Sequence, residues 1–239
     1  MKKKYYGFFN NGKYKVGCNG GSIYVFDQED VELARFKGLS NTYKGAFHPE
    51  ENIFVAKSVG GLIVVYDLDR LSLIRKINIH ASAQDEGFAF SATGNLFYNI
   101  EKPVTSTQTQ LTVCDGLTFE KKAIYFENEE KIFLQHIETY PEVMYLFGFI
   151  RGDNGVGKYP FAAKFANGEI LDIREIRSKS YETPGRWMIW FDTDYEYVKT
   201  YKDWELHGFS EKEAQSHECL LQTPQPPKVT IKQIWELNG

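Results

Sequence analysis

Cysteine and long apolar runs are scarce in this sequence. Its three cysteines, Cys18, Cys114 and Cys219, stand far apart in 239 residues. This spacing argues against a disulfide framework or a cysteine metal cluster, and it suits a reduced compartment. No apolar run reaches the roughly 20 residues of a transmembrane helix, and no signal-peptide core follows the basic start MKKK. We therefore expect a cytoplasmic chain that makes no membrane contact.

The sequence also has no excess of basic residues. Lysine and arginine number 28 against 32 acidic residues, a net charge of −4, which argues against nucleic-acid binding. The five histidines show no H-x-x-x-H or H-E-x-x-H spacing, and no G-x-S-x-G elbow is present. His217-Glu218-Cys219 is better explained as a surface coincidence than as a zinc site. No metal or cofactor is expected.

Strand-forming residues are plentiful, and they recur in a fixed order. Residues 46–78 contain a strand ending at Phe47, a polar turn, NIFVAKS, a glycine pair, LIVVYD and LSLIRKI. These runs have strand length and period 2 rather than the 3.6 of a helix. Comparable strand ends fall at Phe9, Phe90, Ile137 and Phe191, roughly 40–55 residues apart. Four-stranded units with such a period are typical of β-propeller blades.

The second unit resembles a WD repeat. Its FHPEEN turn stands where that family has F-S-P-D-G, and Val64–Asp67 stands where a strand ends in W-D. Phe26-Asp27 and Cys114-Asp115 occupy the corresponding points of the first and third units, whereas the fourth has Phe165-Ala166-Asn167. The family's G-H dipeptide is absent, and the likeness weakens beyond about residue 125. The sequence thus resembles a divergent WD-repeat propeller, which implies a binding platform.

The last third of the chain is less regular. Residues 186–201 predict two strands, residues 210–218 a short helix capped by Ser210 and Glu213, and residues 229–237 (VTIKQIWEL) a closing strand. Counting this region as one unit gives five blades, with six as the alternative. The resemblance implies that the N-terminal strand KKKYYGFF closes the last blade. The prediction is a single all-β propeller domain over residues 1–239.

The stretch RGDNGVGKYP (151–160) imitates two motifs. Gly152 to Lys158 reads G-x-x-x-x-G-K, but Tyr159 replaces the Ser or Thr of a P-loop, and Pro160 and a strand-like run follow. The RGD tripeptide needs an extracellular loop, which nothing in the sequence supports. We interpret the stretch as a glycine-rich hairpin.

Loop length suggests a function. The connections that we place between each unit's innermost strand and the next are short in the first two units, NGG and VGG. They are long in the third and fourth, EKPVTSTQTQ and RGDNGVGKYP, and long loops in a compact repeat are often functional. The hypothesis is a non-enzymatic protein-interaction module or inhibitor-like partner whose rim binds a protein. The candidate contacts are Arg151, Asp153, Lys158, Thr107 and Gln108.

An enzymatic alternative rests on paired carboxylates. Asp192 and Asp194 alternate with Glu196 in a predicted strand, and Asp67 and Asp69 alternate beside Arg70. Glycoside hydrolases use two carboxylates across a cleft, so a glycoside or lactone hydrolase with Asp192 and Asp194 at the centre of the propeller is the second hypothesis. Turn aspartates that bond nearby backbone N–H groups offer a structural explanation for such residues. The sequence leaves the oligomeric state open.

Overall fold

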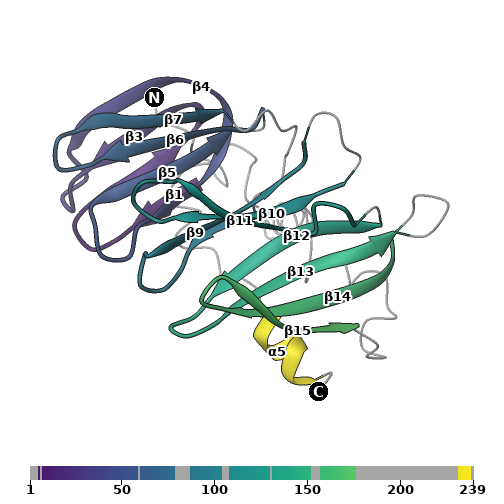
Figure 1. Cartoon of the computed structure of the whole chain (residues 1–239). Helices are drawn as coiled ribbons and strands as arrows, with labels where there is room; N and C mark the ends of the chain where they lie inside the picture. The colour runs from purple at the N-terminus through teal and green to yellow at the C-terminus, as the bar shows by residue number, and fades with distance from the viewer. Residues whose placement is uncertain are drawn as a thin grey trace, which may run out of the picture.

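The computed structural model describes residues 5, 7–58, 60–78, 87–103, 108–129, 131–151, 157–175 and 231–237. Fifteen antiparallel strands and one helix account for most of these residues (Figure 1). The strands form one seven-stranded sheet and two four-stranded sheets, each in the order of the sequence.

The seven-stranded sheet contains two blades that share one long strand. The first blade consists of β1 (Gly7–Asn10), β2 (Lys15–Cys18), β3 (Gly20–Phe26) and the first half of β4 (Glu32–Phe47). The middle of β4 changes direction at Gly38, whose φ of 93° suits a residue without a side chain.

The second half of β4 is the first strand of the second blade. It pairs with β5 (Ile53–Ser58), which is followed by β6 (Leu62–Asp67) and β7 (Ser72–Asn78). The seven-stranded sheet is therefore made of two successive four-stranded repeats that share β4.

The third and fourth blades are separate sheets of four strands. In Figure 1 the third blade lies between the seven-stranded sheet and the fourth blade. The third blade comprises β8 (Phe88–Phe90), β9 (Leu96–Glu101), β10 (Gln110–Asp115) and β11 (Lys121–Tyr125). The fourth comprises β12 (Ile132–Thr139), β13 (Met144–Arg151), β14 (Gly157–Ala166) and β15 (Glu169–Glu175).

The first strand of each blade is the innermost. Strands β1, β4, β8 and β12 contact one another in succession. Of the last strands, β7 and β15 are largely exposed and β11 is partly exposed. The repeat positions Phe9, Phe47, Phe90 and Ile137 all lie in these innermost strands. The prediction of four-stranded, all-β repeats is confirmed for this part of the chain.

Hydrophobic cores fill the spaces between successive blades. Phe54 of β5 is buried in the core between the first and second blades, Phe97 of β9 in that between the second and third, and Phe161 of β14 in that between the third and fourth. Burial of one such ring contributes about 1.5–3 kcal/mol. Neighbouring blades therefore depend on each other for stability, as in other repeat proteins.

Each outer strand carries one β-bulge at an equivalent position. The pairing register with the preceding strand skips one residue in every blade, and three of the four skipped residues are exposed leucine or isoleucine. Bulges bend an edge strand away from regular pairing and so oppose edge-to-edge aggregation. The four bulged residues are Leu33, Ile74, Lys122 and Leu171.

The strand predicted for residues 229–237 is wrong, because Ile231–Leu237 forms the helix α5. In Figure 1 the helix α5 lies beside the strands of the fourth blade. Ile231 and Trp235, one helical turn apart, are buried against Tyr145 of β13. The Glu138 carboxylate accepts hydrogen bonds from the first backbone N–H groups of α5, at 2.7 Å for Ile231. A negative charge at this end complements the helix dipole. Tertiary contacts thus select the helix.

Several predictions for the chain ends fall outside the described residues. These include the strands at 186–201, the short helix at 210–218 and the fifth blade. The described N-terminal strand β1 pairs with β2 in the first blade. Of the residues before Gly7 the structure describes Tyr5, which packs on Tyr24 and Phe26 of β3. Closure of the last blade by the other residues before Gly7 lies outside the described part of the chain.

Candidate binding face

One face of the propeller, here called the loop face, carries the connections between the second and third strands of each blade. The sequence analysis placed these connections after the innermost strand, and that placement is wrong by one strand. Only Asn19 separates β2 from β3, and residues 59–61 separate β5 from β6. The third and fourth blades have longer connections, residues 102–109 and 152–156.

The bases of the two long connections are neighbours. The Thr109 side-chain oxygen, at the end of the first connection, accepts a hydrogen bond from the backbone N–H of Leu134 in β12. In the same strand Ile132 pairs with Ile150. Ile150 precedes Arg151, the residue that ends β13 just before the second connection. The end of the first connection and the start of the second therefore lie near the same end of β12, in adjacent blades.

The structure places three of the predicted contact residues at this face. Arg151 is the last residue of β13 and pairs with Gly157, Lys158 follows in β14, and Gln108 precedes β10 and is half-buried. Thr107 and Asp153 lie outside the described residues. Because residues 157–160 are strand, the interpretation of RGDNGVGKYP as a hairpin is confirmed, and the helix that a P-loop needs is not formed there.

A buried polar network lies just beneath the loop face, between the second and third blades. The Lys57 ammonium group, at the end of β5, donates to the Asn99 side-chain oxygen at 2.9 Å and to the Ile100 carbonyl at 2.6 Å. Lys57 is 5% exposed, and a buried charge of this kind is stable only when it is paired and hydrogen-bonded.

The Glu101 carboxylate is the acceptor at the centre of this network. It receives hydrogen bonds from Asn99 at 3.0 Å, from Gln110 at 2.8 Å and from the Thr112 hydroxyl. Asn99 thus links the positive charge of Lys57 to the negative charge of Glu101. With three donors on one carboxylate, the network is suited to holding the two blades together beneath the long connections.

The opposite face, here called the turn face, is made of tight turns that are capped by their own side chains. Asp27, Asp67 and Asp115 occupy the same place in three blades, and each carboxylate accepts hydrogen bonds from backbone N–H groups of the following turn. These bonds and Lys122 hold the pKa of Asp115 well below its usual range. The structural explanation of the WD-like aspartates therefore applies.

His48 joins the turns of the second and third blades. Its Nδ1 accepts hydrogen bonds from the backbone N–H groups of Glu50 and Glu51, and its Nε2 donates to the Gly94 carbonyl at 3.1 Å. These partners require the neutral ring with its proton on Nε2. His48 is therefore a structural residue of the FHPEEN turn.

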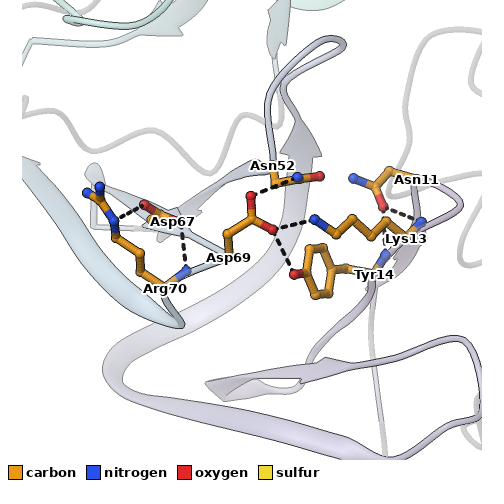
Figure 2. A network of polar contacts seen from close by, with 7 residues as sticks. All are labelled: Asn11, Lys13, Tyr14, Asn52, Asp67, Asp69 and Arg70. Carbon is orange, nitrogen blue, oxygen red and sulfur yellow. Dashed lines mark hydrogen bonds and ion pairs between the residues drawn. The ribbon is translucent and has the colours of Figure 1, made fainter.

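Asp69 joins the turns of the first and second blades (Figure 2). Its carboxylate accepts hydrogen bonds from the Lys13 ammonium group, from the Tyr14 hydroxyl at 2.8 Å and from the Asn52 amide at 2.9 Å. The bond from Lys13 contributes most to lowering the pKa of Asp69 from 3.8 to about 2. Asp67 and Asp69 therefore cap and bridge turns, and they do not face each other across a cleft.

Acid should weaken this bridge, and replacing Asp69 should remove part of the acid sensitivity. Because the pKa of Asp69 is lower in the folded chain than the ordinary 3.8, its contribution is present above about pH 4 and is lost as the pH falls towards 2. Asp69→Asn should lower the melting temperature at pH 7 and flatten its decline between pH 4 and pH 2. Thermal unfolding at a series of pH values measures both effects, with the exposed Glu50→Gln as the control. An unchanged slope in Asp69→Asn contradicts this account.

The thiols of the described residues are not poised as nucleophiles. Cys18 is buried, and burial raises its pKa well above the usual range. Burial also raises the pKa of Cys114 to about 11, whereas reactive cysteines have lowered pKa values. Among the residues that the structure describes, no three His, Cys, Asp or Glu side chains are grouped as metal ligands. Asp192 and Asp194, the residues of the hydrolase hypothesis, lie outside the described residues.

Comparison with solved structures agrees with this geometry. The Kuenenia stuttgartiensis hydrazine synthase matches 74% of this chain with a TM-score of 0.56 and 13% identity. The WD40 domain of Toxoplasma gondii coronin matches 72% with a TM-score of 0.54 and 10% identity, and that of Neurospora crassa Pan2 matches 71% with 0.50 and 12%. The fold is a WD-repeat-like β-propeller. The matches cover 50%, 45% and 51% of those chains respectively, so this propeller chain spans about half of their length.

Sequence comparison adds nothing to this assignment. No protein-family model matches the WD-repeat-like chain, and no curated protein matches it by sequence. Within the described part of the propeller, no helix is long and apolar enough to cross a membrane.

Proposed function

We propose that this propeller is a protein-interaction module that binds its partner through the loop face. The observation that carries the proposal concerns the two long connections, residues 102–109 and 152–156. The end of the first and the start of the second lie near the same end of β12, in adjacent blades. Long connections on a rigid scaffold are common binding elements. The similarity to WD40 domains supports a scaffold of this class, because propellers present loops of neighbouring blades on one surface.

The contrast between the two faces supports the same choice. On the turn face, Asp27, Asp67, Asp115 and His48 use their side chains to satisfy backbone N–H groups of their own turns. The side chains of those turns therefore stabilise the fold and are not free to bind a partner through the same atoms. The long connections of the loop face exceed what joining two antiparallel strands requires, and their extra length is available for contact. The partner-binding residues in this proposal are Arg151, Asp153, Lys158, Thr107 and Gln108.

Charge reversal on the loop face tests the proposal. Arg151→Glu combined with Lys158→Glu should reduce the amount of captured partner by roughly fivefold or more, since rim charges steer association and contribute about 1 kcal/mol each. The measurement is cross-linked capture of the tagged full chain from its native host, quantified by mass spectrometry. Arg70→Glu, an exposed charge reversal on the turn face, is the matched control. Equal capture by the loop-face variant and the control overturns the proposal.

A further inference from the structure

A pocket of about 210 Å³ lies on the turn face between the third and fourth blades. Tyr98, Met144 and Phe165, each at most 3% exposed, form its apolar and aromatic part. Exposed polar residues of three turns surround it. Pockets for drug-sized ligands are typically about 300–1,000 Å³, so this smaller volume suits a single side chain.

The pocket lies beside the one turn that departs from the repeat. Where three blades have a capping aspartate, the fourth has Ala166. Asn167 and Gly168 follow it, with φ values of 53° and 82°. Positive φ at both positions is the conformation of a two-residue hairpin turn. Such a turn is shorter than the aspartate-capped turns, and it leaves the Asn167 side chain without a capping role.

Three side chains around the pocket offer unused acceptor oxygens. Asn95, Asn167 and Glu142 are exposed and make no side-chain hydrogen bond or ion pair within the part of the chain that the structure describes. Other polar residues of the turn face, such as Asn11 and Asp69, already accept hydrogen bonds through their side-chain oxygens. Glu142 is the one charged residue that lines the pocket, and no basic residue lines it. An anionic ligand is therefore disfavoured, and a cation is favoured.

We propose that this pocket binds an arginine side chain of a protein partner. A guanidinium group has five N–H donors in a plane, which suits the Glu142 carboxylate and the amide oxygens of Asn95 and Asn167. The methylene stem of arginine packs on apolar surface such as Met144 and Phe165. Lysine has a more strongly hydrated charge and three donors, so it suits this set of acceptors less well. The site is on the opposite face from the proposed partner-binding loops and does not depend on them.

Peptide titration of the full chain tests the proposal. The probes are the capped tripeptides Gly-Arg-Gly and Gly-citrulline-Gly, which have nearly the same shape but differ in charge. In ¹H–¹⁵N NMR spectra the arginine peptide should shift the amide signals of Glu142 and Asn167. It should bind at least about fivefold more tightly than the citrulline peptide, the effect of one charge-assisted hydrogen bond.

The variant Glu142→Gln should weaken arginine binding by a similar factor and remove the preference over citrulline. Glu51→Gln, an exposed turn-face residue outside the pocket, should change neither. Three results overturn the proposal: no shift of the pocket signals with the arginine peptide, equal affinity for the two peptides, or undiminished arginine binding by Glu142→Gln. In each variant, unchanged NMR signals away from the substituted residue establish that the protein remains folded.

Discussion

Lys57→Met should reduce the free energy of unfolding by about 3–5 kcal/mol, the typical cost of breaking a buried charge pair. The methionine keeps the length of the stem, but Asn99 and the Ile100 carbonyl lose the donor that satisfies them. The Glu101 carboxylate is then left buried with no positive charge in its network. Urea denaturation measures the loss, and the exposed Lys76→Met on β7 should change stability by less than about 0.5 kcal/mol.

A double variant distinguishes this network from simple loss of packing. If Asn99 couples Lys57 to Glu101, Lys57→Met with Glu101→Gln should cost at least about 1 kcal/mol less than the sum of the two single variants, because the second change removes the unpaired charge. Strict additivity, or a Lys57→Met variant as stable as Lys76→Met, contradicts the assignment of this network as the link between the second and third blades.

Gly116→Ala is expected to have the second large effect. It should reduce the free energy of unfolding by about 3 kcal/mol or more. A Cβ at Gly116 would lie 1.6 Å from the Gly94 carbonyl oxygen, which also accepts the hydrogen bond from His48. The neighbouring atom is backbone, so it cannot rotate away as a side chain can, and the turn must shift. Overpacking of this kind typically costs about 1–3 kcal/mol and more where backbone has to move. The same denaturation experiment measures it.

The matched control is Gly21→Ala in β3. No atom lies within 4 Å of a Cβ built at Gly21, so alanine there should leave stability nearly unchanged or raise it by restricting the unfolded chain. A Gly116→Ala variant within about 0.5 kcal/mol of the original protein contradicts the close stacking of His48, Gly94 and Gly116 across two blades.

The repeat could be predicted from the sequence because its signals are local. Strand-length runs of period 2 separated by turn residues place Phe47 and Phe90 in equivalent strands, and the structure confirms this. The aspartates that end the third strands were also recognisable. Asp67 and Asp115 cap the turns that follow them, a role that depends only on residues within four positions.

The buried network could not be predicted in full, because it depends on the spacing between blades. Lys57 looks like the solvated end of an apolar strand. Its contact with Asn99 joins residues that are 42 positions apart. One signal was available in the sequence. Asn99 and Glu101 are two and four residues after Phe97 in β9 and therefore lie on the same side of the strand as Phe97. In a propeller both sides of a second strand are covered, so polar residues at such positions indicate a buried network.

The helix α5 was missed for a related reason. The segment Ile231–Leu237 fits both period 2 and the i, i+4 spacing of a helix, so its sequence alone is ambiguous. The choice is made by distant residues. Arg174 of β15 stacks 4.1 Å from the Trp235 ring and donates to the Trp235 carbonyl at 3.2 Å, and Glu138 caps the other end.

The most direct test of the proposed function is to shorten both long connections of the loop face. Residues 103–108 and 152–156 would each be replaced by two glycines, keeping Thr109 because it binds Leu134. Capture from the native host and thermal unfolding are then measured on the same preparation. We predict that the partner captured by the original chain is lost while the melting temperature remains within a few degrees. Capture of the same partner in the same amount by the shortened, folded chain would contradict the account.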